Sequence, residues 1–372
     1  MAQTPFAFDP HPADPQVGFD IGWDHAHHGR VPPPDHLHPG NPVRQGWQAG
    51  KACFGARTLG ASRLVRQWLQ LRLQAWVMGR VFERDQVTPH YLGQLDVPQC
   101  PVTRQALGGG DGVIARVHDS AGYAAGNLAM MGSLARRAKG TLDWQEALMQ
   151  AHRAGAPEGS TVQGLNAAAW SRLAVLMSFV TVLPHAQAAC LPLLVQPPNR
   201  LRVLNPVQGL QALVTRELGR PDGTRRLRAL AQLLPGDALR LDFNLFLSAL
   251  LPRLIEAGQG QPTWVLRHVL EDAWRDARVN RCWQRFALQL DESLVEALLQ
   301  QCAAKAIAGT HLLLHAPATA TEGWALATRG LALQPRAAAI QLRDRPAATV
   351  PPNRARITPS RVRVAADGHL PA

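Results

Sequence analysis

Apolar side chains recur at steps of three and four residues along much of the chain, which is the spacing of amphipathic helices. The clearest stripe follows Ser62, a residue type that commonly caps a helix N-terminus, and it continues to Val77. Most of the chain after residue 140 is rich in Leu and Ala at the same spacings. The pattern therefore predicts a mainly α fold.

Cap residues predict where the later helices begin. Asp143 followed by Glu146 has the spacing of a capping box, and Asn166 and Asp291 are typical N-caps. Pro184 would stop a helix that starts after Asn166. The helices predicted on this basis are 142–154, 166–182, 242–255, 263–288 and 291–307.

Residues 100–140 depart from the helical pattern. A glycine-rich run at 108–112 predicts a flexible connection, and 113–117 has the composition of a short strand. A strand or turn is expected before them, and Asn127 is expected to cap a helix that ends at Lys139. The segment is thus predicted to form a small ββα element.

Composition shifts divide the chain into four parts. The first, 1–50, is rich in Pro, Gly, His and Asp, which predicts a loop-rich arm. A basic domain at 51–156 carries the ββα element, and a Gly- and Pro-containing linker separates it from an α-helical domain at 165–334. Residues 335–372 lose the periodicity and carry seven Arg against two Asp, which predicts a basic disordered tail.

The charge balance indicates a polyanionic partner. The chain has 372 residues, with 39 Lys and Arg against 27 Asp and Glu, a formal charge of +12. Residues 51–140 hold twelve of the cations and only five acidic residues. An excess of positive charge favours nucleic acid through phosphate neutralisation and counterion release. Positive charge that is simply solvated at the surface is the alternative.

Several function classes find no support in the sequence. Five widely spaced cysteines form neither a disulfide framework nor a CxxC pair, which favours a reducing, cytoplasmic environment. The longest apolar run, 173–183, is too short to cross a bilayer, so no membrane association is expected. No P-loop, dinucleotide-binding, HExxH or GxSxG motif is present, which disfavours ATPase, dehydrogenase, metalloprotease and hydrolase-fold functions.

Histidines are concentrated in the N-terminal arm, where they alternate with aspartates. Imidazole and carboxylate groups bind zinc and other divalent ions, so this segment is a candidate metal site. The alternative is a polar loop whose histidines make ordinary hydrogen bonds. The candidate ligands are His25, His27, His28, His36 and His38.

Motifs in residues 100–140 follow one another in a definite order. They are a Cys-x-x-Thr turn at Cys100 and Thr103, an arginine in the expected strand at Arg116, the pair Gly122 and Tyr123, and Asn127. This order resembles the ββα finger of the HNH-type (treble-clef) endonucleases, in the branch with a Cys-x-x-Thr turn, an Asp-Arg strand and Gly-Tyr-x-x-x-Asn. The chain departs from that pattern at Ala115, where the family has its metal-binding or water-activating Asp or His.

The resemblance implies contact with nucleic acid more securely than cleavage, because the usual base is replaced and the zinc-binding CxxC pairs are missing. The expected contacts are phosphate-binding cations and one residue for packing or base stacking. The cations are Arg116, Arg136, Arg137 and Lys139, with Arg63 and Arg66 on the preceding helix, and the residue for packing or base stacking is Tyr123.

Two further hypotheses stay open at this stage. A metal-dependent endonuclease would use a divalent ion such as Mg²⁺ or Zn²⁺, with His118 as the base and Asp111 or Asp119 as partner. An α-helical interaction scaffold would have no nucleic-acid role at all.

Overall fold

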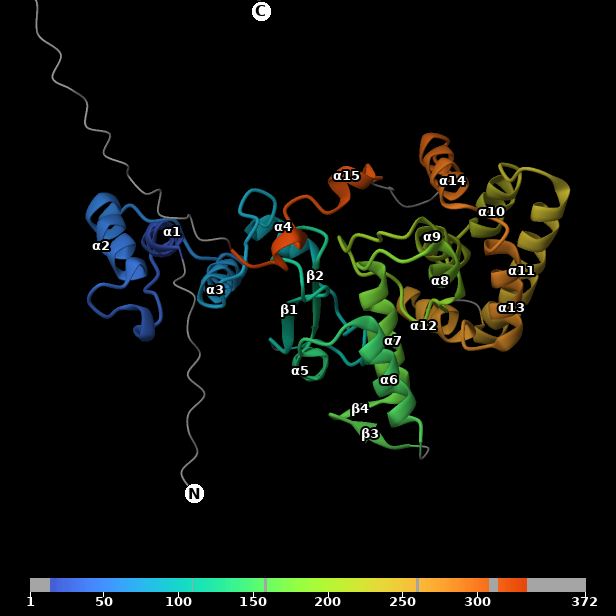
Figure 1. The fold of residues 1–372 in the computed structure, drawn as a ribbon, viewed down its shortest axis with the longest axis horizontal. Coiled ribbons are helices and arrows are strands. Elements are labelled where there is room, and N and C mark those ends of the chain that lie inside the picture. Colours follow the sequence, from blue (N-terminus) through green and yellow to red (C-terminus); the bar gives the residue numbers. More distant parts are fainter. Residues whose placement is uncertain (1–13, 109, 157–158, 259–260, 308–313, 333–372) are drawn as a thin grey trace, which may run out of the picture. The chain divides into compact units, whose positions relative to one another are not determined.

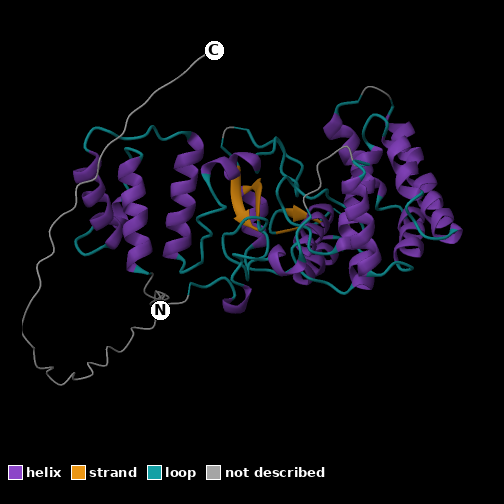
Figure 2. Cartoon of the chain, turned by 90° about the horizontal axis from the view of Figure 1, so that it is seen from above, coloured by secondary structure: helices purple, strands orange, loops and turns teal. Residues whose placement is uncertain are grey.

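The computed structural model is mainly helical, with two small two-stranded antiparallel sheets, as the apolar spacing predicts (Figures 1 and 2). The structure describes residues 14–108, 110–156, 159–258, 261–307 and 314–332.

The N-terminal segment is a pair of helices, so the prediction of a loop-rich arm over residues 1–50 is wrong for its described part. Helix α1 spans Pro15–His27 and α2 spans Pro42–Phe54, and the 3-10 turn η1 (Pro34–His36) lies between them. Each α-helix begins with proline after a capping Asp or Asn, and both features favour a helix start. Pro15 and Pro42, which contributed to the loop prediction, are therefore the first residues of helices.

Glycines set how closely α1 and α2 approach. A Cβ on Gly22 would lie 1.9 Å from the carbonyl oxygen of Val43, and one on Gly46 would lie 1.8 Å from that of Phe19. Neither separation is sterically allowed, so only glycine permits this packing. Backbone contact between the helices explains why a segment with few apolar side chains folds into helices.

The next part of the chain contains the predicted ββα element. Helix α3 (Arg63–Val77) is capped by Ser62 as predicted, and α4 (Pro89–Gln94) follows it. Strand β1 (Gly112–Arg116) pairs with β2 (Leu128–Gly132), and α5 (Ser133–Lys139) starts directly after β2. Asn127 is not the helix cap that the sequence predicts, because the residues after it continue as β2.

The two faces of the β1–β2 hairpin contact different helices. The register pairs Ile114 with Met130 and Ala115 with Ala129. Successive side chains of a strand point to opposite faces. Ile114 and Met130 accordingly pack in a cluster with α3 and α4, whereas Ala115 and Ala129 belong to the large core shared with the later helices.

After α5 the regular elements of the described chain are helices, apart from the short pair β3 (Thr161–Val162) and β4 (Leu165–Asn166). The predicted helix 263–288 is in fact two helices, and the helix expected to start at Asp242 begins earlier. The helices are α6 (Trp144–Ala154), α7 (Ala167–Phe179), α8 (His185–Cys190), α9 (Pro206–Leu218), α10 (Gly223–Ala231), α11 (Asp237–Ala257), α12 (Thr263–Ala273), α13 (Ala277–Ala287), α14 (Glu292–Ala304) and α15 (Pro317–Ala320), followed by the turn η2 (Leu326–Thr328).

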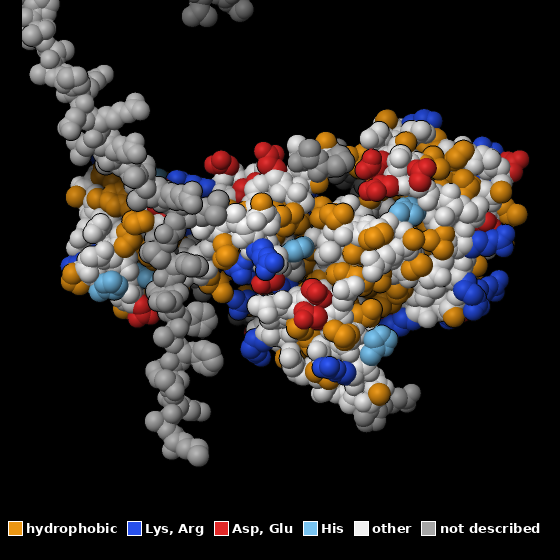
Figure 3. Space-filling view, viewed as in Figure 1, with side chains coloured by type: hydrophobic (Ala, Val, Ile, Leu, Met, Phe, Trp, Pro, Cys, Tyr) orange, Lys and Arg blue, Asp and Glu red, His pale blue; other side chains and the backbone are white. Residues whose placement is uncertain are grey.

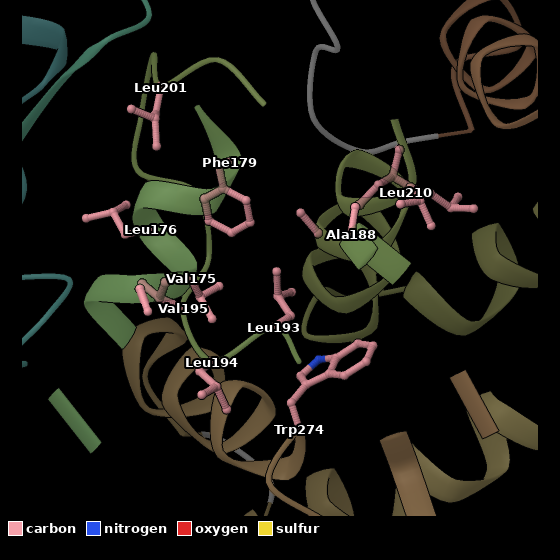
Figure 4. Packing of buried hydrophobic residues seen from close by; sticks show 14 of the residues in the cluster. Val175, Leu176, Phe179, Ala188, Leu193, Leu194, Val195, Leu201, Leu210 and Trp274 are labelled. Carbon is pink, nitrogen blue, oxygen red and sulfur yellow. The ribbon is translucent and has the colours of Figure 1, made fainter. Parts of the chain in front are cut away.

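The large core is continuous from Cys100 to Trp324. Figure 4 shows Val175 and Phe179 of α7 beside Leu193, with the indole of Trp274 approaching from the end of α12. Around Trp274 the helices α11 and α13 add a cluster of buried aromatic rings. Burial of large aromatic rings such as these stabilises a core strongly.

Contacts cross the predicted linker and join the two predicted domains. The guanidinium of Arg104, just after the Cys100 turn, contacts Glu271 and Asp272 on α12 at 3.1 and 2.7 Å. From α7, Arg172 donates to the carbonyl oxygen of Val102 at 2.6 Å. Residues 1–334 thus form one compact unit. The second unit, 335–372, lies outside the described residues, and so does the prediction of a disordered tail.

A C-terminal segment, residues 321–332, returns to the hairpin region. The amide of Gly122 donates to the carbonyl of Trp324 at 2.8 Å, and the Trp324 indole donates to the carbonyl of Ala125 at 3.0 Å. Val81 donates to Gly330 at 2.9 Å. Residues 321–332 therefore contact and stabilise the β1–β2 loop, although about 200 residues of sequence separate the two segments.

Candidate nucleic-acid interface

The loop between β1 and β2 is held by the buried side chain of Asn127. Its Oδ1 accepts the amide of His118 at 2.8 Å, and its Nδ2 donates to the carbonyls of His118 and Gly122 at 3.1 and 3.0 Å. All of the amide's main hydrogen-bonding capacity is used on the loop backbone. Asn127 therefore acts as a loop anchor, which fixes the positions of the candidate catalytic residues.

Arg116 is structural, contrary to the prediction that it contacts phosphate, and Tyr123 is a packing residue, the first of the two roles predicted for it. The Arg116 guanidinium donates to the carbonyls of Asp119 and Ala121 and lies 5.1 Å from the centre of the Tyr123 ring. Tyr123 is 4% exposed and its hydroxyl points to the sulfur of Met78. Neither side chain can reach a phosphate or stack on a base while the loop keeps this conformation.

Asp119 is surrounded by three cations. Its carboxylate lies 2.9 Å from Arg116, 3.8 Å from Arg80 and 3.9 Å from Lys139. Lys139 is also structural rather than a phosphate contact, because it is 2% exposed. Burial is the main reason that the pKa of Lys139 falls from 10.5 to about 8, and it outweighs the opposing effect of Asp119. The cluster thus holds more positive than negative charge away from solvent.

We expect Lys139→Met to stabilise the protein by about 1–3 kcal/mol at pH 7. Because the lysine pKa is about 8 in the folded chain and 10.5 ordinarily, the unfolded chain binds the proton more tightly. The contribution of Lys139 to the free energy of unfolding is therefore lowest below pH 8, and it rises as the pH increases from about 8 to 10.5. Urea unfolding at several pH values should show this rise in the parent and a smaller rise in the variant.

Arg137→Met is the matched control for that measurement, since Arg137 is exposed on the same helix. Its effect should stay within about 0.5 kcal/mol at every pH. A Lys139→Met variant less stable than the parent at pH 7 would show that the contacts of the ammonium with Asp119 and the Gly140 carbonyl outweigh its burial.

The candidate catalytic residues do not come together. Asp111 precedes β1 and His118 follows it, so about 20 Å of extended chain separates them. Asp119 is next to His118 but is occupied by the cations described above. The pKa of His118 is lowered, first by burial and then by Lys139, and its Nδ1 is buried without a hydrogen-bond partner in the described structure.

The N-terminal histidines also do not converge. His25 is buried and its Nδ1 bonds the Ile21 carbonyl, while His27 stacks on Phe54 and His36 packs against Trp76. His28 has its Nδ1 buried without a partner in the described chain, and His38 contacts the Asn41 side chain. Among the residues that the structure describes, no three His, Cys, Asp or Glu side chains form a group that fits a metal ion. The predicted zinc or magnesium site therefore does not fit this arrangement.

The exposed polar side of α3 faces a groove that also contains Arg136. The groove has a volume of about 480 Å³, and both aliphatic and polar side chains line it. Gln70 and Gln74 of α3 lie about one turn and about two turns after Arg66, on the same side of the helix. The groove is lined by His36, Gln70, Leu73, Gln74, Val77, Val113 and Arg136.

Three arginines at this groove or beside it keep donors for an anion, although one guanidinium nitrogen of Arg66 donates to the carbonyl oxygen of Ala61 at 3.1 Å. Arg66 and Arg137 are exposed and Arg136 is partly exposed, and none of them has a carboxylate partner in the described part of the chain. Arg63 differs, because it is 2.8 Å from Asp96. We call Arg66, Gln70, Gln74, Arg136 and Arg137 the α3–α5 surface. The glutamines were missed in the sequence, although their spacing from Arg66 places them on one helical face.

Positive charge is not gathered on a single face. Figure 3 shows Lys and Arg side chains in separate groups, one over the region between α3 and α5 and another over α11 and α13, with acidic side chains elsewhere on the same face. Many arginines are used in ion pairs, as with Arg104 and Arg116. The net charge of the chain therefore overstates the charge available to a partner.

Comparison of the chain with protein-family models, curated proteins and solved structures found no match. Among the described residues, no helix combines the length and the apolar character required to cross a membrane.

Proposed function

We propose that the chain binds nucleic acid through the α3–α5 surface and that the ββα element serves as its scaffold. The observation that carries the proposal is the placement of Arg136 in a groove with Gln70 and Gln74, beside Arg66 and Arg137. Arginines without carboxylate partners keep their charge available for phosphate oxygens. Arginine and glutamine side chains are common contacts to phosphate oxygens and to base edges.

The proposal includes no cleavage step. Phosphodiester hydrolysis needs a base for water and positive charge at the developing oxyanion. Asp111 and His118 lie at opposite ends of β1, and Asp119 is held by Arg116. A binding role uses the arginines that are exposed and requires nothing of these three residues.

We expect the double variant Arg136→Ala, Arg137→Ala to weaken binding of a fluorescein-labelled oligonucleotide by about tenfold at low salt. Loss of one or two phosphate contacts should also reduce the slope of log Kd against log salt by about one to two. Fluorescence anisotropy across a salt series measures both quantities. Circular dichroism confirms that the variant is folded.

The matched control is Arg278→Ala, Arg281→Ala on α13, where both arginines are exposed and the change in charge is the same. This variant should lose only the general electrostatic attraction, so its affinity for the oligonucleotide should fall by about two- to threefold. Equal losses in the two double variants, or no binding by the parent at low salt, would contradict the proposal.

A further inference from the structure

We infer that the groove of the α3–α5 surface receives an unpaired nucleotide, so that the ligand is single-stranded rather than duplex nucleic acid. This inference rests on the proposed function and specifies its ligand. The groove is shallow and open, and its volume of about 480 Å³ suits one nucleotide and not the width of a double helix. Duplex recognition usually requires a helix or ribbon that projects into a groove of the nucleic acid.

The lining of the groove matches the parts of a nucleotide. Val77, which is 53% exposed, and the half-buried Val113 give the groove an aliphatic floor that can cover the apolar face of a base. Gln70 and Gln74 each offer a donor and an acceptor to a base edge. In single strands these edges are free, whereas in a duplex they are paired.

Arg136 supplies the charge at the groove and His36 supplies a neutral polar edge. The guanidinium of Arg136 can bind phosphate through two parallel hydrogen bonds. Burial lowers the pKa of His36, against the opposing effect of Asp35, so the imidazole is uncharged near pH 7 and can donate or accept. A nucleotide needs a basic group for its phosphate and neutral polar groups for its base edge, and this lining offers both.

One arginine outside the groove continues the same path. Arg66 lies about 12 Å from Gln74 along the axis of α3, and Arg137 follows Arg136 on α5. A strand seated in the groove and running along α3 would therefore present a neighbouring phosphate to Arg66, whereas Arg137 points to a different side of α5 from Arg136. Sequence preference is expected to be weak, because contact with the floor is open to every base.

The test compares four labelled ligands of equal length by anisotropy: oligothymidylate, oligouridylate, an abasic deoxyribose-phosphate strand and a DNA duplex. We expect either intact single strand to bind at least about tenfold more tightly than the duplex or the abasic strand. The thymidylate and uridylate arms show whether the groove prefers DNA or RNA. A duplex that binds as tightly as the single strands would overturn the inference.

Two variants locate the effect in the groove. Val77→Trp fills the groove from a half-exposed position, and Gln70→Ala with Gln74→Ala removes the amides. Both should lower single-strand affinity to the abasic level and leave abasic binding unchanged. Leu59→Trp is the control, since Leu59 is 54% exposed and is not part of the groove lining.

The outcomes separate the two proposals. If the groove variants bind intact strands as the parent does, while Arg136→Ala, Arg137→Ala weakens every ligand, the inference fails and the proposed function stands. If Arg136→Ala, Arg137→Ala loses no more affinity than Arg278→Ala, Arg281→Ala, the proposed function and the inference both fail.

Discussion

Trp324→Ala should lower the free energy of unfolding by about 3–5 kcal/mol, the usual range for removing a large aromatic side chain from a core. Trp324 is fully buried, and its indole N–H donates to the carbonyl of Ala125. The alanine variant leaves a cavity and a carbonyl without its donor. Since Trp324 lies on the returning segment 321–332, its loss also loosens the contact of that segment with the β1–β2 loop.

Urea unfolding followed by far-ultraviolet circular dichroism measures this effect without relying on tryptophan fluorescence. Trp264→Ala is the matched control, because Trp264 is 51% exposed and contacts the ring of His268. The free energy of unfolding of this control should fall by less than about 1 kcal/mol. Should the alanine variant fail to fold, Trp324→Phe keeps most of the ring volume and isolates the hydrogen bond. Two tryptophan variants of equal stability would show that the returning segment contributes little.

Helix starts could be predicted from the sequence because a cap is a local interaction. Ser62 accepts the amide of Val65, and Asp143 and Glu146 form the predicted capping box. Asp291 likewise accepts the amide of Leu294. Each bond spans three residues, so the residue types alone determine it.

Asn127 and the N-terminal helices show where local patterns fail. Asparagine serves equally well as a helix cap or a loop anchor, and the choice depends on whether the next residues pair with a distant strand. Helices α1 and α2 are formed by glycine-rich faces that fit only each other, as at Gly22 and Gly46. Glycine weakens an isolated helix, so propensity argued against a structure that tertiary contact makes stable.

The candidate site was predicted only in part, for a related reason. The number of arginines is given by the sequence, but their partners are not. Arg63 is paired with Asp96 and Arg116 is buried against Asp119, while Arg136 and Arg137 lack carboxylate partners among the described residues. Availability for a ligand depends on folded neighbours that can be far apart in sequence. Charge counts therefore predict a class of partner better than they predict contact residues.

Arg72→Met should lower the free energy of unfolding by about 3–5 kcal/mol, because it leaves the buried carboxylate of Asp24 without its main partner. The two side chains form an ion pair between α3 and α1 and are only 5% and 11% exposed. Arg72 also lies 4.5 Å from the centre of the Trp68 ring. Arg84 is 3.8 Å from Asp24 and mostly exposed, so it can replace only part of the lost interaction.

A double variant distinguishes the attraction of the pair from the penalty of an unpaired charge. Arg72→Met with Asp24→Leu removes both charges, and it should be more stable than Arg72→Met alone by about 2 kcal/mol or more. Arg63→Met is the control on the same helix as Arg72. It breaks the exposed ion pair of Arg63 with Asp96 and should change the free energy of unfolding by less than about 1 kcal/mol. A double variant no more stable than Arg72→Met would mean that the attraction itself, and not the avoided burial of a lone carboxylate, holds α1 against α3. The N-terminal helix pair would then depend on this one contact as much as on its glycine packing.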